Sequence, residues 1–303
     1  MSTARFLRRE KAVFDSACME FKEKFIAFVD ILGFKSLVEA SEAGTGKPLD
    51  DLLRLVDILG TGNERDKYER SGPICCPRSS YSQRNLDFRL TQISDCVIVS
   101  AEISPAGIIN LIHHCSTAVL DLMIKGFMCR GYITRGNIYH TDRQVIGSGY
   151  QRAYSQEEKV SIFKREADER GTPFVEVDSV VSKYVEESLD KCVKEMFSRF
   201  VKSDDQAIAL FPFQGLSHSF LVNGAMPFDP KRERRENQKV RLLLSNLRTG
   251  IMAHVDTSKS TALQKAEQYI NAMDAQLAVC NETEHFIDEL VSPILARTFE
   301  QSC

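Results

Sequence analysis

The sequence predicts an α+β fold, in which helices pack on one face of a sheet and a helical C-terminal extension follows. Short apolar runs rich in strand-forming residues alternate with helix-like segments over residues 22–180. The dipeptide Ser94-Asp95 separates two such runs, and two residues are the length of a hairpin turn. From residue 237 onward helical periodicity dominates. We therefore expect a sheet domain over 22–180 and an extension over 181–303 that is first mixed and then helical.

Each element has a local signal. Residues 24–30 form an apolar strand-like run, and Gly33 allows a tight loop before a helix. Pro105 predicts the start of a helix that Gly126 ends. The expected elements are, in order, a strand at 24–30, helices at 35–40 and 49–59, an exposed excursion at 61–84, strands at 88–93 and 96–100, a helix at 106–125, strands at 127–134 and 137–140 broken at Gly136, a helix from 148 to about 165, a strand at 173–177, a helix from 178, and helices at 240–254, 260–280 and 285–299.

Composition excludes several classes of protein. The chain has 39 Lys and Arg against 42 Asp and Glu, a net charge of −3, so it is not a general nucleic-acid coat. Its nine cysteines include no CxxC pair, which favours reduced thiols over a disulfide framework or a zinc site. No apolar run approaches the ~18 residues of a membrane helix, and the charged first residues lack a signal-peptide core. We expect a cytoplasmic protein with no membrane or stable nucleic-acid partner.

Two carboxylates stand out because of where they fall. Asp30 closes a buried strand and Asp95 occupies the hairpin turn, so both project from one sheet edge if their strands are neighbours. Paired acids repel unless a cation lies between them, and hard oxygen ligands suit Mg²⁺ or Mn²⁺. Amides at 32–35 begin a helix and favour phosphates, to which Lys35 adds charge. Singly, each acid equally fits a plain structural role, as a helix N-cap or a turn residue.

The residues around these acids resemble a known family. Residues 28–37, FVDILGFKSL, look like the first metal-binding motif of class III nucleotide cyclases, and Gln92-Ile93-Ser94-Asp95 is similar to the second. The segment 131–136 resembles the strand-turn after that family's central helix, and Gly147, Ala153 and Glu157 resemble the spacing before its last catalytic helix. The resemblance covers about 22–180 and implies a ferredoxin-like class III cyclase catalytic domain.

By the same resemblance the protein is a head-to-tail homodimer with its sites at the interface. Asp30, Asp95 and the carbonyl of Ile31 would hold two Mn²⁺ or Mg²⁺ ions, which activate the ribose 3′-hydroxyl for attack on the α-phosphorus and release pyrophosphate. Phe34 and Lys35 of the first motif would contribute to substrate binding.

Departures from the family pattern concern base recognition and the transition state. Thr91 stands where adenylate cyclases carry a Lys and guanylate cyclases a Glu, and Gln144 replaces an Asp, so neither purine reader is present. Gln151 and Ser155 replace the transition-state Asn and Arg, and Gln151 can still donate to a ribose or phosphate oxygen as a catalytic residue. The missing guanidinium then has candidate substitutes, Arg135 first, Arg130 second, with Arg152 also near in sequence.

This combination resembles the stand-alone pyrimidine cyclases of bacterial Pycsar anti-phage defence, which make cyclic UMP or cyclic CMP to trigger a separate effector. We therefore expect a pyrimidine nucleoside triphosphate as substrate, UTP with CTP as the alternative. Two other readings stay open: a catalytically silent cyclase-like module that binds nucleotide, and a structural protein whose acids are caps. His140 follows a strand near the expected cleft, whereas His113-His114 fits a helix core.

Overall fold

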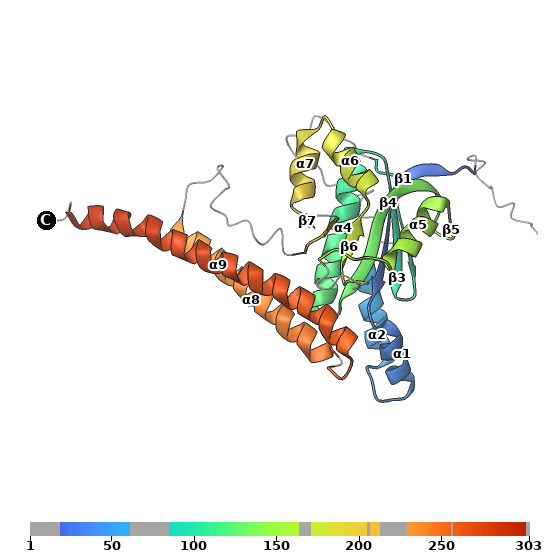
Figure 1. Cartoon of the computed structure of the whole chain (residues 1–303), viewed down its shortest axis with the longest axis horizontal. Helices are drawn as coiled ribbons and strands as arrows, with labels where there is room; N and C mark the ends of the chain where they lie inside the picture. Colours follow the sequence, from blue (N-terminus) through green and yellow to red (C-terminus); the bar gives the residue numbers. More distant parts are fainter. Residues whose placement is uncertain are drawn as a thin grey trace, which may run out of the picture.

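The computed structural model describes residues 19–60, 85–163, 171–204, 207–212, 229–255 and 257–300, with side chains to residue 291 in the last range. An eight-stranded mixed sheet has helices against it, and a long helical hairpin projects from it (Figure 1). The strands are β1 Lys22–Ile31, β2 Phe88–Ile93, β3 Cys96–Glu102, β4 Cys129–His140, β5 Val145–Ile146, β6 Val175–Val177, β7 Val201–Ser203 and β8 Ile208–Leu210. The helices are α1 Phe34–Glu42, α2 Leu49–Val56 with the 3₁₀ turn Asp57–Leu59, α4 Pro105–Ile124, α5 Ser148–Glu157, α6 Ser179–Glu187, α7 Lys191–Ser198, α8 Pro230–His254 and α9 Ser260–Glu300.

The first four strands form the centre of the sheet in the order β2-β3-β1-β4, and all their pairings are antiparallel. With helices between β1 and β2 and between β3 and β4, this is the βαββαβ arrangement of a ferredoxin-like fold. Beyond β4 the sheet continues through β6, β8 and β7. The predicted α+β fold with a helical C-terminal part is confirmed. The edge strands β8 and β7 lie beyond the expected boundary at residue 180 and belong to the same sheet.

Strand β1 has a buried apolar residue on both faces, which explains its continuous apolar run. Phe25, Ala27, Val29 and Ile31 join the main core with α4, while Ile26 and Phe28 pack on the opposite face against α5. Successive side chains in a strand alternate between faces. Asp30 therefore belongs to the α5 face of the sheet, and helices lie on both faces rather than on the single face expected.

Helix α4 is the core helix of the domain. Its N-cap Ser104 accepts a hydrogen bond from the Gly107 amide, and Pro105 occupies the first turn. An 18-residue window of α4 has a mean hydropathy of 1.4, so by length and composition it would span a membrane, yet 72% of that window is buried in the fold. The expectation that no apolar run reaches this length was wrong, because a helix buried on most sides is apolar all round.

Strand β4 is continuous, whereas the sequence predicted a break at Gly136. The glycine serves a close approach: a Cβ at Gly136 would lie 2.9 Å from the Cα of Gly149 in α5. Helix α5 ends at Glu157 and not near residue 165, and turns follow it. Strands β7 and β8 were not expected, because three-residue strands carry too little pattern. The predicted excursion at 61–84 lies outside the described residues.

We expect Gly136→Ala to lower the free energy of unfolding by about 1–3 kcal/mol, because the added methyl overpacks the β4–α5 contact. Gly250→Ala in α8 is the matched control. There the nearest atoms to an added Cβ are 3.7 Å away, so removing a helix glycine should raise stability by about 0.5–1 kcal/mol. Urea unfolding of both variants measures this, and equal effects of the two substitutions would contradict the close-approach explanation.

The C-terminal extension is a hairpin of two long helices rather than three shorter ones. Buried positions recur at alternating spacings of three and four, which is the pattern of a coiled-coil seam. They are Glu233, Asn237, Val240, Leu244, Leu247 and Ile251 in α8, and Ala266, Tyr269, Met273, Gln276, Cys280, Thr283 and Ile287 in α9. Gln268 of α9 is also buried, outside this spacing. The sequence predicted a break between residues 280 and 285, but Thr283 keeps the buried spacing through this polar stretch and α9 is continuous. Asp229 caps α8 by accepting from the Lys231 and Arg232 amides, so the helix begins ten residues earlier than predicted.

Candidate active site

Asp30 and Asp95 meet at one end of the sheet. Asp30 lies opposite Cys96 in the β1–β3 ladder, and the Ile31 amide donates to the Asp95 carbonyl at 3.0 Å. Ser94 takes a left-handed conformation, with φ of 54°, in the predicted two-residue turn. The N-cap of α1 is Gly33, with φ of 78° and no side-chain cap. Asp30 is thus not a helix cap, and the two acids occupy adjacent backbone at the same edge.

Asp30 lies close to two other acidic side chains, and its pKa shows their effect. Burial, and after it the negative charges of Asp95 and Glu157, raise the pKa of Asp30 to about 7, against the opposing charge of Arg130. Burial and the same three acids raise the pKa of the Cys96 thiol to about 12. We call Asp30, Asp95 and Glu157 the acidic group. A cation placed there would relieve the repulsion that keeps Asp30 protonated.

The raised pKa of Asp30 makes stability depend on pH in the metal-free protein. Between the unfolded pKa of 3.8 and the folded pKa of about 7 the native state binds the extra proton, so its stability falls as pH rises through that window. Asp30→Asn removes this loss. We expect it to add about 1–2 kcal/mol at pH 8, discounted for partial exposure, and nothing at pH 4. Thermal unfolding in EDTA at both pH values measures this; a gain that is the same at pH 4 would contradict it.

Arg130 is the arginine that the fold places in the acidic group. It lies directly opposite Asp30 in the β1–β4 ladder, and its Nε donates to the buried carboxylate of Glu157. The pairing of Arg130 with Glu157 was not predicted from the sequence. A signal was available: Glu157 follows Ala153 by four residues, which places it on the buried side of α5.

The other candidate catalytic residues lie apart from the acidic group of the same chain. Arg135, five residues along β4, projects from the opposite face and forms a paired contact with Glu23 at 3.0 and 2.9 Å. Arg152 on α5 contacts the buried Asp178 at 3.2 Å. Gln151 and Ser155 are exposed, one turn apart on α5. An exposed face of this kind is free to complete a site on another molecule.

The residues after Asp30 have distinct environments. Phe34 is 8% exposed and packs in the main core, so its side chain serves the fold rather than a substrate surface. Lys35 is exposed, 3.8 Å from Glu39. The backbone amide of Leu32 donates to the Met128 carbonyl. This amide, one of the four at 32–35 expected to bind phosphates, is therefore already used within the fold.

The donor set fits a magnesium-type ion better than a closed metal site. Within the residues that the structure describes, no group of three or more His, Cys, Asp or Glu side chains is arranged to hold a metal ion. Mg²⁺ typically takes one or two carboxylates and completes its shell with water and substrate phosphates. Asp30 and Asp95 supply two carboxylates whose mutual repulsion a divalent cation would offset, and the Ile31 carbonyl is the third candidate ligand by position.

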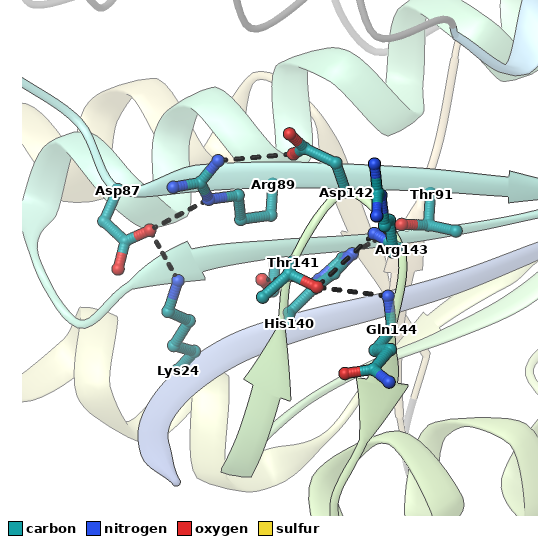
Figure 2. Close-up of polar contacts among 10 residues, drawn as sticks. Lys24, Asp87, Arg89, Thr91, His140, Thr141, Asp142, Arg143 and Gln144 are labelled. Carbon is teal, nitrogen blue, oxygen red and sulfur yellow. Dashed lines mark hydrogen bonds and ion pairs between the residues drawn. The ribbon is translucent and has the colours of Figure 1, made fainter. Parts of the chain in front are cut away.

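Thr91 and Gln144 lie around His140 (Figure 2), and the ladders place Thr91 level with Phe28, two residues before Asp30. His140 is buried, and its two ring nitrogens contact Thr91 Oγ1 at 3.0 Å and Ser100 Oγ at 2.9 Å. Gln144 closes the turn after β4, where its backbone N–H donates to Thr141 Oγ1 at 3.1 Å. His114 is a core histidine, as expected, and contacts the Leu59 carbonyl at 3.0 Å.

Comparisons with known proteins found a distant structural similarity. No family model and no curated protein matches the chain. Solved structures that match include the catalytic core of a rhodopsin-guanylyl cyclase with converted specificity in complex with ATPαS. The identity is 12% and the TM-score 0.32, over 55% of this chain and 83% of that one. This similarity is too low to carry an argument about activity.

Proposed function

We propose that the protein is a metal-dependent nucleotide cyclase. The observation that carries the proposal is the meeting of Asp30 and Asp95 at one sheet edge, next to a glycine turn and a helix start, inside the motifs that resemble class III cyclases. Two Mg²⁺ or Mn²⁺ ions held there would lower the pKa of the ribose 3′-hydroxyl and offset charge on the phosphates. The ions would be held by Asp30, Asp95 and the Ile31 carbonyl. The positive charge of Arg130 would partly offset the negative charge of these acids.

The proposed substrate is a pyrimidine nucleoside triphosphate, UTP first and CTP as the alternative. Thr91 and Gln144 stand at the positions that read purines in the resembling family, and neither side chain matches the adenine or guanine reader. The resemblance to the Pycsar branch further suggests that cyclic UMP serves in the cytoplasm as an antiviral second messenger for an effector outside this chain.

We propose a head-to-tail homodimer with sites formed between protomers. Ile93, Tyr154 and Ile146, from the β2–β3 hairpin, α5 and β5, are 52%, 57% and 55% exposed. Large apolar side chains exposed around a polar site are typical of a surface that another chain covers. Gln151 from α5, with Arg135 or Arg152, would then act on the acidic group of the partner, since these side chains lie away from their own.

The decisive experiment is incubation of the purified protein with ATP, GTP, CTP and UTP in turn, with Mn²⁺ and with EDTA, followed by chromatography of the products. We expect cyclic UMP and pyrophosphate with Mn²⁺ only. Turnover of ATP alone would overturn the pyrimidine assignment. Tight nucleotide binding without pyrophosphate release would favour the silent module, for which the replaced positions Gln151 and Ser155 are the supporting observation. The absence of any metal-dependent thermal shift would favour the structural protein.

A further inference from the structure

The turn after β4 folds back over the sheet and brings His140 onto two other strands. Thr91 is on β2 and Ser100 on β3, and both face the same side as Asp30, since Thr91 pairs with Ile98 and Ile98 with Phe28. The His140 ring bridges them, Nε2 to Thr91 Oγ1 at 3.0 Å and Nδ1 to Ser100 Oγ at 2.9 Å. With 8% exposure for His140 and none for Ser100, this is a built contact rather than a surface encounter.

Charged side chains fix the turn in this position (Figure 2). Arg89 on β2 donates to Asp142 of the turn at 3.3 Å and lies 3.8 Å from Asp87. Asp87 in turn pairs with the buried Lys24 of β1 at 2.7 Å. Asp142 therefore ties the turn to Arg89 of β2, and Arg89 is linked through Asp87 to Lys24 of β1, which favours the position in which His140 contacts Thr91.

The surroundings determine which ring nitrogen carries the proton. Burial, and after it the charges of Lys24 and Arg89, lower the pKa of His140 to about 4, against the opposing charges of Asp87 and Asp142. The ring is therefore neutral, with one donor and one acceptor. Among the described residues, the buried Ser100 hydroxyl has a hydrogen bond to His140 Nδ1 and no other. A buried hydroxyl proton without an acceptor costs about 1–3 kcal/mol, so Ser100 donates to Nδ1. Nε2–H then donates to Thr91 Oγ1.

This assignment gives Thr91 a defined polarity. With its oxygen accepting from His140, the Thr91 hydroxyl has its proton left for another acceptor, and the side chain is only half-buried. We propose that His140 is a positioning residue for base selection, which holds the Thr91 hydroxyl as a donor toward a ring carbonyl oxygen of the nucleobase. The inference rests on the proposed function and refines it: at ring position 4 uracil presents a carbonyl oxygen where cytosine presents an amino group, so a donor at this position distinguishes the two bases.

The test compares two amide substitutions of His140 that differ in reach. An Asn amide overlays the Nδ1 side of a histidine and keeps Ser100 but not Thr91, whereas a Gln amide reaches the Nε2 position. We expect His140→Asn to lower the preference for UTP over CTP in kcat/KM by about 10-fold, as Thr91→Val does. His140→Gln should stay within about 3-fold of the wild type, and Thr91→Val/His140→Asn should be no worse than Thr91→Val alone.

Calorimetric binding of 3′-deoxy-UTP and 3′-deoxy-CTP with Mg²⁺ to the same variants separates this inference from the proposed function, because these nucleotides cannot cyclise. Selective binding lost in Thr91→Val and His140→Asn, without turnover by the wild type, would support the base contact and refute the cyclase. Turnover with unchanged selectivity in His140→Asn would refute the base contact alone. No binding of either nucleotide and no turnover would overturn both, and thermal unfolding confirms that each variant is folded.

Discussion

Asp95→Asn is expected to lower the kcat of pyrimidine cyclisation by about 10³-fold or more, and Asp30→Asn to do the same. Each change keeps the shape of the side chain but removes one of two carboxylates that would hold the ions, and a loss of about 4 kcal/mol in transition-state stabilisation corresponds to that factor. Pyrophosphate release under saturating UTP and Mn²⁺ measures it.

The matched control is Asp50→Asn, an exposed carboxylate in the first turn of α2, which should leave kcat within about 2-fold. Asp30→Asn carries an internal check as well. The same substitution that removes activity should stabilise the metal-free protein above pH 7, because it relieves the repulsion within the acidic group. An Asp30→Asn protein that is inactive and also less stable at pH 8 would point to a structural role instead.

The sequence predicted the centre of the fold because its signals there are local. The apolar run before Asp30, the two-residue turn at Ser94-Asp95 and the Pro105 helix start each determine one element, and together they bring the two acids to one edge. The error at Gly136 has the opposite origin. Gly136 is required because a Cβ there would lie 2.9 Å from the Cα of Gly149 in α5. In the sequence, such a glycine looks the same as a glycine that ends a strand.

The neighbours of the acidic pair were harder to predict, since they depend on how β4 and α5 lie over the sheet. Arg135 was the first choice for the missing guanidinium and Arg130 the second, yet strand alternation places Arg135 on the other face of the sheet, where it pairs with Glu23. His140 reaches Thr91 only because the turn folds back, a long-range contact across 49 residues. Sequence patterns specify which face a residue takes within its element, but not which other element covers that face.

Arg130→Met is expected to lower the free energy of unfolding at pH 7 by about 3–5 kcal/mol, which is the usual cost of removing one partner from a buried ion pair. The Arg130 and Glu157 side chains are 15% and 5% exposed, so Glu157 would be left buried without its cation. Arg54→Met is the control. Arg54 pairs with Asp51 at 3.3 Å on the exposed side of α2, and its loss should cost less than about 0.5 kcal/mol.

Removing the other partner should cost less, because the two ends of this pair have different neighbours. Without Glu157, Arg130 still lies beside Asp30, and one negative charge fewer acts on that carboxyl. The pKa of Asp30 then falls and its carboxylate takes over the pairing. Without Arg130, Glu157 has only the other two acids of its group, so the pKa of Asp30 rises further. We therefore expect Glu157→Gln to destabilise by about 1–2 kcal/mol at pH 7. Urea unfolding of both variants measures the asymmetry, and equal losses would show that Arg130 and Glu157 form an isolated pair independent of Asp30.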